Sequence, residues 1–193
     1  LAENLHAHGY RIALHYRQAK AEAQAVADAL NAKRPDSCLL LQADLAISTE
    51  RDALIAQIIA HYGQLDVLIN NASSFAPTPI GSADDANWDD LFNSNARAPF
   101  FLSQAAAPYL RKQRGCIINI ADIYGINPKP QHTIYSMAKA ALLMMTKSLA
   151  LELAPEIRVN AIAPGAILWP EAGMSEQSQT AMLEQTPLAR MGD

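Results

Sequence analysis

The chain has 193 residues, half of them apolar, which is enough to bury one good core and predicts a single domain. Its 15 basic and 19 acidic residues give a net charge of -4, and no basic run suggests a nucleic acid or an anionic membrane as a partner. No apolar run approaches the roughly 20 residues of a membrane helix, and no signal-peptide pattern opens the chain, so we expect a cytoplasmic protein.

The predicted elements alternate between strand and helix along the chain. Five short apolar runs are predicted strands: Arg11 to Tyr16, Cys38 to Gln42, Val67 to Ile69, Cys116 to Ile120 and Arg158 to Ile162. Alanine-rich stretches between them are predicted helices, including a long one from about Asp84 to Gln113 and another from Tyr135 to Ala154. Such alternation implies an α/β fold with a parallel sheet that helices cover on both faces. No repeat, low-complexity linker or charge block marks an internal domain boundary.

The two cysteines, Cys38 and Cys116, lie in apolar, strand-like runs. A thiol in such a place behaves as a small apolar group, so we expect both to be reduced and structural. We predict no metal site.

The segment after Pro164 and Gly165 has a different character. From Ile167 to Thr186, Pro170, Gly173 and the polar run SEQSQ predict a mobile loop followed by a short helix.

Tyr135 and Lys139 are the main candidates for chemistry. They lie four residues apart, so on a helix they share a face, and the Lys139 ammonium would favour the ionised form of the Tyr135 phenol. A phenol with an ordinary pKa of about 10 would then become a usable proton donor near neutral pH. Alone, such a pair more often marks a half-exposed helix face. Asp122 favours the active-site interpretation, because it lies thirteen residues upstream, just after the predicted strand Cys116 to Ile120.

Five motifs in this order resemble the short-chain dehydrogenase/reductase family along the whole chain. They are Asp44-Leu45, Asn70-Asn71-Ala72 with Ser73 where glycine is usual, Asn95 within NSNARAPF, the pair Tyr135 and Lys139, and Pro164-Gly165. The resemblance implies a doubly wound Rossmann-type sheet and nicotinamide-dependent oxidoreduction. The implied cofactor-binding residues are His15, Tyr16, Arg17, Asp44, Leu45, Asn71, Ala72, Ser73, Tyr135, Lys139, Pro164 and Gly165.

The resemblance also implies that both ends of the chain are incomplete. The opening LAENLHAHGY is predicted to be the second half of a helix, without the strand and glycine-rich turn that the family places before it. The glycines of that turn let backbone amides approach a pyrophosphate. The final PLARMGD stops where the family continues with one more helix and strand. A sheet without its central first strand would expose unpaired backbone, so we expect the working protein to be longer.

Arg17 determines the predicted form of the cofactor. It follows His15-Tyr16 at a strand end, where family members that use the unphosphorylated cofactor tend to carry an Asp for the ribose hydroxyls. A guanidinium can bind a phosphate through two hydrogen bonds, whereas an acid would repel it, so we predict NADPH. The alternatives are that Arg17 is a solvated residue at a strand end and that His15 is a polar cap.

Asp122 bears on the substrate. Most of the family has a Ser thirteen residues before the Tyr, and its hydroxyl can donate to a ketone oxygen. An ionised Asp only accepts hydrogen bonds, and its charge opposes ionisation of Tyr135. Unless Asp122 is protonated, the site therefore favours a nitrogen heterocycle that carries N–H groups.

Phe75 and its neighbours narrow the resemblance to the pteridine reductases. The residues that carry it are Asn71 to Phe75, Pro77-Thr78-Pro79, Asp122 and Tyr135 to Lys139. In those enzymes the matching Phe sandwiches a pterin against the nicotinamide, and the Asp and Tyr act on ring nitrogens. The implied substrate-binding residues are Ser73, Phe75, Asp122, Tyr135 and Trp169, the last in the segment that closes over substrate in this family. The alternative for Phe75 is an ordinary core position.

The resulting hypothesis is the NADPH-dependent reduction of a dihydropterin or dihydrofolate. Tyr135 would donate the proton, and Lys139 would lower the Tyr135 pKa and hold the ribose. Asp122 would orient the pterin, and Asn95 would kink its helix and help to position Lys139 through water. Two alternatives stay open: a carbonyl reductase of the same fold, such as a 3-oxoacyl-thioester reductase, and a non-catalytic nucleotide-sensing or scaffold protein.

The helix from Tyr135 to Ala154 also bears on the oligomeric state. Residues 140–145 are all apolar, which predicts burial on more than the sheet side. In the family this helix and the preceding long one pair across a tetramer, so the resemblance favours a homotetramer.

Overall fold

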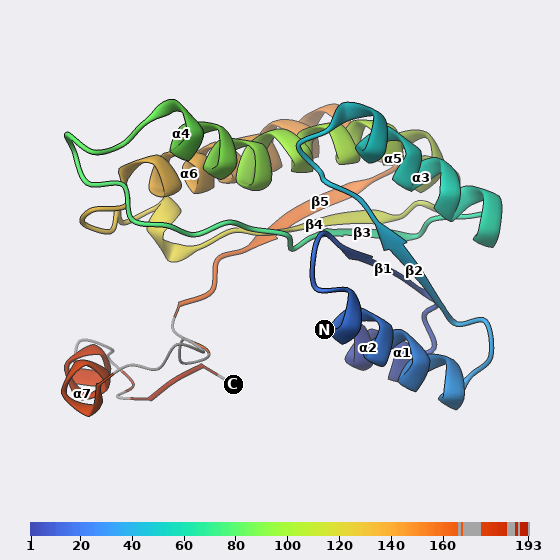
Figure 1. Cartoon of the computed structure of the whole chain (residues 1–193). Coiled ribbons are helices and arrows are strands. Elements are labelled where there is room, and N and C mark those ends of the chain that lie inside the picture. The colour runs from blue at the N-terminus through green and yellow to red at the C-terminus, as the bar shows by residue number, and fades with distance from the viewer. Residues whose placement is uncertain (166, 168–174, 185–187, 189, 193) are drawn as a thin grey trace.

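The computed structural model (Figure 1) has an α/β architecture and describes residues 1–165, 167, 175–184, 188 and 190–192. Its strands are β1 (Ile12–Tyr16), β2 (Cys38–Gln42), β3 (Val67–Asn70), β4 (Cys116–Ile120) and β5 (Arg158–Ile162). Its helices are α1 (Ala2–Ala7), α2 (Lys20–Lys33), α3 (Ser48–Tyr62), α4 (Asp85–Phe92), α5 (Ala98–Gln113), α6 (Thr133–Glu152) and α7 (Glu176–Glu184). The five predicted strands are confirmed, with a difference of one residue at the start of β1 and at the end of β3.

All of the strand pairs are parallel. β1 pairs with β2, with Ile12 opposite Cys38, while β4 lies between β3 and β5, with Cys116 opposite both Val67 and Arg158. The carboxyl ends of neighbouring strands therefore lie at a common edge, where the loops that carry the candidate site begin.

The sheet is divided between β1 and β3. These two strands do not hydrogen-bond to each other, so the strands form one two-stranded and one three-stranded sheet. An apolar cavity of about 690 Å³ lies between them, with Ile12, Leu14, Ile55, Leu68 and Leu102 among its lining residues. No strand within the described ranges lies in this place.

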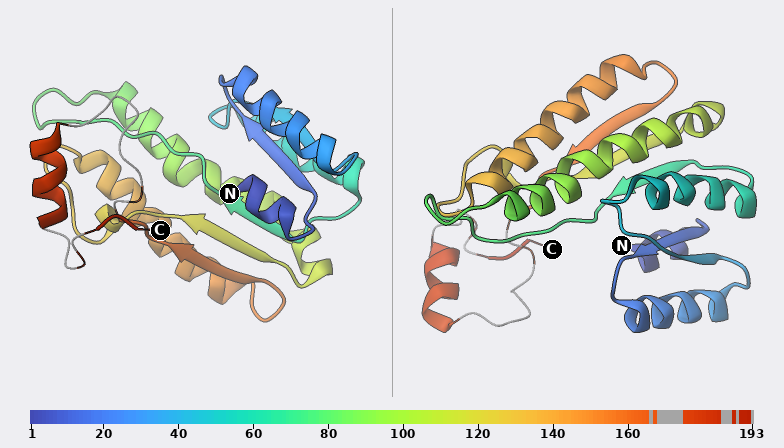
Figure 2. Two further views of the ribbon diagram at one scale, coloured as in Figure 1. Left: turned by 90° about the horizontal axis from the view of Figure 1, so that it is seen from below. Right: turned by 45° about the horizontal axis from the view of Figure 1, so that its top comes forward.

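Helices cover both faces of the strands, as a doubly wound Rossmann-type fold requires (Figures 1 and 2). On one face, α1 and α2 pack on β1 and β2 around Leu30 and Ala27. On the other face, α3 and α5 enclose a larger core that includes Leu54 and Leu110, and this core reaches β2 through Leu41. Gly63, in the left-handed conformation with φ 75°, ends α3, and glycine adopts this conformation at little cost.

The predicted long helix from about Asp84 to Gln113 consists of α4, a π-helical turn at Asn93–Arg97, and α5. Its start is fixed by a capping box, in which the Asp84 side chain accepts from the Asn87 N–H and the Asn87 side chain from the Asp84 N–H. The π turn contains Asn95 and interrupts the α-helical hydrogen bonding there, while the predicted kink at Asn95 stays a prediction. Such single wide turns often occur at functional sites.

Helix α6 begins two residues before the predicted start, at Thr133, and ends at Glu152. One of its faces buries Tyr135, Lys139 and Leu142 against the sheet. On the opposite face, the side chains of Met144 and Leu151 are 63% and 83% exposed. None of the helices in the described part of the chain has the length and hydropathy needed to cross a bilayer.

Candidate active site

Asp122 and Tyr135 meet at the carboxyl end of β4. Asp122 lies two residues beyond the strand, and its Oδ1 accepts a hydrogen bond of 2.9 Å from the Tyr124 N–H, which starts a short 3₁₀ turn, Ile123–Gly125. Its Oδ2 accepts a hydrogen bond of 2.7 Å from the Tyr135 hydroxyl. Because Tyr135 lies in the first turn of α6 and is only 4% exposed, its phenol is held against the carboxylate. The predicted contact between the two residues is therefore present.

The pKa of the Tyr135 phenol is raised, not lowered. Burial is the main cause, followed by the hydrogen bond to Asp122 and the negative charge of that carboxylate, whereas Ser73 acts in the opposite direction. This overturns the expectation that Lys139 lowers the pKa of Tyr135, and it agrees with the argument that a carboxylate opposes ionisation of the phenol. In this state Tyr135 is a firmly protonated donor.

Lys139 faces the strand end beside the phenol. Its Nζ donates a hydrogen bond of 3.0 Å to the Ile120 carbonyl and lies 5.6 Å from the centroid of the Tyr135 ring. Burial lowers the pKa of the Lys139 ammonium, and the negative charge of Asp122 partly opposes this effect. Helical spacing thus places the Lys139 ammonium near the Tyr135 ring, although the ammonium donates its hydrogen bond to the Ile120 carbonyl and not to the Tyr135 hydroxyl.

Asn95 ties the π turn to the loop after β3. Its Oδ1 accepts a hydrogen bond of 2.7 Å from the Ser73 hydroxyl, and its Nδ2 donates to the carbonyls of Ser74 and Leu91, each at 2.9 Å. The side chain is almost fully buried, at 1% exposure. The geometry thus shows Asn95 as an anchor for the Ser73–Ser74 loop, and its predicted action on Lys139 through water stays a prediction.

Phe75 is not a core residue, because 53% of it is exposed. Its ring meets that of Tyr135 edge-on at a centroid distance of 4.8 Å and stacks on that of His132 at 4.7 Å. The Lys129 ammonium lies over the Phe75 ring, 5.1 Å from its centroid. The alternative of a buried structural aromatic is therefore wrong, and the ring borders Tyr135, while the predicted stacking of Phe75 on a substrate stays a prediction.

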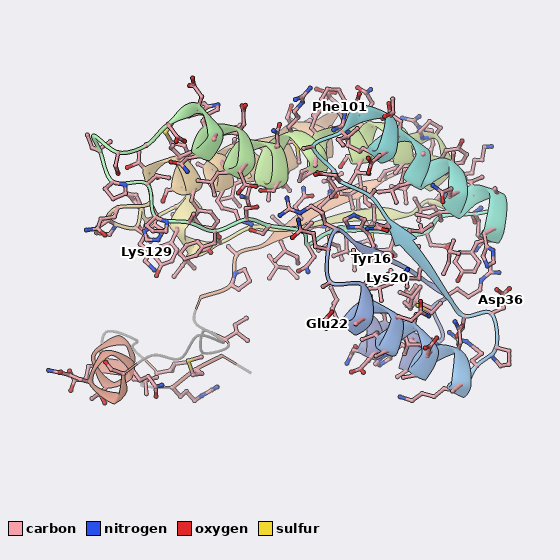
Figure 3. The ribbon with its side chains drawn as sticks, viewed as in Figure 1. Tyr16, Lys20, Glu22, Asp36, Phe101 and Lys129 are labelled. Atoms are coloured by element: carbon pink, nitrogen blue, oxygen red, sulfur yellow. The ribbon has the colours of Figure 1, made fainter. Side chains whose placement is uncertain are left out.

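A second cavity, of about 260 Å³, lies at the carboxyl ends of β1, β2 and β3. It is lined by most of the residues predicted to hold the cofactor, together with several others: His15, Tyr16, Arg17, Asp44, Leu45, Ala46, Ala72, Ser73, Ser74, Asp90, Asn93 and Ser94. The labelled Tyr16 marks its place at the end of β1 in Figure 3. We refer to this cavity as the cofactor groove. Its position matches the crevice in which doubly wound sheets bind nucleotides.

Charges within the cofactor groove are loosely paired. The Arg17 guanidinium lies 3.9 Å from an Asp90 carboxylate oxygen, and both side chains are about half exposed, at 50% and 48%. The ring of His15 contacts the Ala43 carbonyl at 2.9 Å, which agrees with the alternative of a polar cap. Arg17 is thus a half-exposed cation at the groove, and its predicted contact with a cofactor phosphate stays a prediction.

The remaining predicted residues lie beside these two sites or outside the described residues. Asn71 lines the larger apolar cavity. The Pro164 carbonyl accepts a hydrogen bond of 3.2 Å from the Ile123 N–H, which brings Pro164 and Gly165 next to the turn that carries Asp122. Trp169 and most of the loop predicted around it lie outside the described residues, and α7 confirms the short helix predicted after that loop.

Sequence reasoning missed Lys129, His132, Tyr124 and Asp90. The first three lie between Asp122 and α6, and their side chains meet Phe75 or one another through the fold of that loop. Asp90 meets Arg17 across 73 positions of the chain. For Tyr124, Lys129 and His132, the sequence offered one indication of a role in the site: they are polar or aromatic and lie between Asp122 and Tyr135.

Comparison with known proteins assigns the family, because residues 1–181 match the family model for short chain dehydrogenases. The chain belongs to the short-chain dehydrogenase family. Members are nicotinamide-dependent oxidoreductases, and this assignment favours an oxidoreductase over the non-catalytic alternative.

Two kinds of relative match at similar identity. Pteridine reductase 1 of Leishmania tarentolae is 40% identical over 210 aligned residues, which cover 89% of this chain and 73% of that protein. The 3-oxoacyl-(acyl-carrier-protein) reductase FabG of Staphylococcus aureus (strain Mu50) is 36% identical over 195 residues, covering 100% and 79%. FabG of Thermotoga maritima is 37% identical over 150 residues, covering 75% and 61%. Identity alone therefore assigns an oxidoreductase and leaves its substrate open.

Proposed function

We propose that this oxidoreductase reduces a pterin, such as a dihydrobiopterin or dihydrofolate, with NADPH. The observation that carries the proposal is the 2.7 Å hydrogen bond from the Tyr135 hydroxyl to Asp122, with the exposed Phe75 ring meeting Tyr135 edge-on. Together these groups offer a flat apolar face, a carboxylate acceptor and a proton donor within one small area. A pterin has the matching features: a flat ring, N–H donors on one edge and a ring nitrogen to protonate.

Asp122 is the group that favours a nitrogen heterocycle over a simple ketone. An ionised carboxylate accepts hydrogen bonds and has none to donate to a ketone oxygen. In the structure both Asp122 oxygens already accept from protein groups, Tyr124 N–H and Tyr135 O–H. Since each carboxylate oxygen has two lone pairs, N–H groups of a substrate can bind to the same carboxylate.

Tyr135 is the proposed proton donor. The environment that raises the pKa of Tyr135 keeps the phenol protonated when no substrate is bound. When a substrate nitrogen replaces Asp122 as the acceptor of this hydrogen bond, the proton can move to that nitrogen, and the nearby Lys139 ammonium then stabilises the phenolate that forms. Buried charges interact more strongly than exposed ones, so the low exposure of Lys139, at 3%, increases this effect.

The bound cofactor supplies the hydride, and the residues of the groove provide its binding site. Arg17 would hold the 2'-phosphate, which is the reason to propose NADPH over NADH. His15, Tyr16, Asp44 and Leu45 would line the adenosine, while Ser73 and Lys139 lie towards the catalytic end. We propose that residues 1–193 act as one nicotinamide-binding domain.

The direct test is the loss of NADPH absorbance with dihydrobiopterin or dihydrofolate, compared with an acetoacetyl thioester. We expect kcat/KM for the pterin to exceed that for the thioester by about 100-fold or more, because the thioester would leave polar groups of the site unpaired. A larger value for the thioester would instead support the second candidate, a 3-oxoacyl-thioester reductase, which the two FabG relatives favour.

We also propose that the protein is a homotetramer. Phe100, at the start of α5, and Met144 and Leu151 on α6 are large apolar side chains that stay 40%, 63% and 83% exposed. Burying such side chains against another copy would remove apolar surface from water. Size-exclusion chromatography with light scattering should give a mass near four chains, and Met144→Glu should lower it.

A further inference from the structure

Lys129, labelled in Figure 3, lies in the loop between the 3₁₀ turn and α6. Its Nζ is 5.1 Å from the centroid of the Phe75 ring and 5.1 Å from that of Tyr124. Aromatic faces attract a cation, so the two rings hold the ammonium at one place. The Lys129 N–H also donates to the Ser136 hydroxyl at 3.4 Å, which links the loop to the first turn of α6.

Among the described residues, no acid forms an ion pair with this ammonium. Within the described part of the chain, no carboxylate comes within 4.0 Å of the Lys129 Nζ. The acid of the site, Asp122, accepts hydrogen bonds from Tyr124 and Tyr135. Two rings therefore position a cation beside the active site and leave its charge available to a ligand.

Phe75 connects this cation with the reacting groups. The ring that lies under the Lys129 ammonium also meets the Tyr135 ring at 4.8 Å, and Tyr135 donates to Asp122. A flat substrate that stacks on Phe75 and binds Asp122 through its N–H edge would carry its substituents on its other edges. Lys129 is a cation in reach of such a substituent, because its long side chain can leave the Phe75 face when the substrate covers it.

We propose that Lys129 determines substrate specificity by binding an anionic substituent on the heterocycle. This inference rests on the proposed pterin reduction and makes it more specific. The anionic group can be the carboxylate of a folate-type tail or a phosphate ester on a pterin side chain, since both bind an ammonium through charge-assisted hydrogen bonds. A neutral side chain, such as the dihydroxypropyl group of dihydrobiopterin, gains nothing from it.

Matched substrates test the proposal. The measured quantities are two selectivity ratios of kcat/KM: dihydrofolate over dihydrobiopterin, and dihydroneopterin phosphate over dihydroneopterin. In Lys129→Met, which keeps the length and removes the charge, we expect the ratio for the preferred anion to fall about tenfold, mainly through KM. Lys129→Arg should keep most of that ratio. If the ratio of dihydrofolate over dihydrobiopterin falls, the anion is a carboxylate. If the ratio of dihydroneopterin phosphate over dihydroneopterin falls, it is a phosphate.

Lys112 provides the matched control. Its Nζ also lies over an aromatic ring, 5.8 Å from the Tyr109 centroid, in the last turn of α5. Lys112→Met should leave both ratios within twofold of the wild type. A second readout is ionic strength, because added salt screens an exposed ion pair. Salt should raise KM for the anionic substrate in the wild type and have a smaller effect in Lys129→Met.

The outcomes separate two kinds of failure. Unchanged ratios in Lys129→Met, or equal losses on charged and neutral substrates, would show that Lys129 only covers the Phe75 ring and would overturn the inference while pterin reduction stands. A wild-type enzyme that reduces the acetoacetyl thioester and none of the pterins would overturn the proposed function and this inference together.

Discussion

The catalytic pair and the cofactor groove differ in how their polar groups are satisfied. At the catalytic pair, Asp122 receives hydrogen bonds at 2.7 and 2.9 Å, and the buried chain Asn70, Asn119 and Thr146 links β3, β4 and α6 behind it through bonds of 2.8 Å. In the groove, the main charge pair is 3.9 Å apart and half exposed. The first arrangement is preorganised for chemistry, and the second leaves charge ready for a ligand.

The two regions also differ in what supports them. Of the candidate catalytic residues, Asp122 follows β4, and Tyr135 and Lys139 lie on α6, which packs directly against β4 and the 3₁₀ turn. The groove takes residues from the end of β1 and the loop after β2 on one side, and from the loop after β3, α4 and the π turn on the other, across the division of the sheet. Changes at the catalytic pair should therefore act on turnover, and changes in the groove on cofactor affinity.

The largest expected effect is that of Tyr135→Phe. The substitution removes the hydroxyl that donates to Asp122 and keeps the ring that meets Phe75. We expect kcat to fall about 1,000-fold, within the range for loss of a general acid, while the Kd for NADPH stays within threefold. Steady-state kinetics and NADPH fluorescence titration measure the two quantities. Substantial turnover would show that another group supplies the proton.

Asp122→Ser should have the next largest effect. We expect kcat/KM for a pterin to fall about 100-fold, because a charge-assisted acceptor for the ring N–H groups is lost. Since the Asp122 carboxylate raises the pKa of Tyr135, its removal should lower that pKa. The alkaline limb of the kcat/KM profile should therefore move to lower pH.

Asp122→Asn is the control for this variant. It keeps the shape of the side chain and removes the charge, so the alkaline limb should shift in the same direction as in Asp122→Ser.

If the rate of pterin reduction is the same in Asp122→Ser as in the wild type, the argument that Asp122 favours a nitrogen heterocycle fails.

Arg17→Ala should have a smaller effect that is confined to the cofactor. Losing one guanidinium–phosphate contact should raise KM for NADPH about 30-fold and leave KM for NADH nearly unchanged. The measurement is the ratio of kcat/KM for the two cofactors with one substrate. Equal effects on both would mean that Arg17 is a solvated residue at the strand end.

Asp90→Asn is expected to have the smallest effect. Its carboxylate competes with a bound phosphate for Arg17, but an exposed pair of this kind contributes little. We expect KM for NADPH to fall about twofold, with kcat unchanged. A rise in KM would indicate that Asp90 itself binds the cofactor.

Local pattern was sufficient to predict most of the fold and the catalytic contact. The strands were recognisable because β-branched and other apolar residues concentrate in runs such as Cys116 to Ile120. The spacing of Tyr135 and Lys139 required only the helical repeat, and Asp122 followed from its place after a strand. These features depend on neighbours in the sequence.

The remaining features depend on contacts that the sequence pattern does not show. The pKa of Tyr135 was expected to fall because Lys139 is near, but burial, the hydrogen bond to Asp122 and the charge of that carboxylate raise it. The rings around Lys129 come together through a loop without a regular repeat, and Arg17 meets Asp90 only through tertiary packing. The sequence therefore did not reveal how burial would change the pKa of Tyr135, nor which distant residues would contact Lys129 and Arg17.

The π turn at Asn93–Arg97 holds one residue more between α4 and α5 than a regular α turn would. Deleting one residue from this turn would leave a regular α-helix and would nearly keep the rotation of α5 against α4. The side chains of the turn itself would move, and Asn95 would lose the Ser73 hydroxyl. Such a deletion should consequently spare the packing of α5 and release the Ser73–Ser74 loop from its anchor.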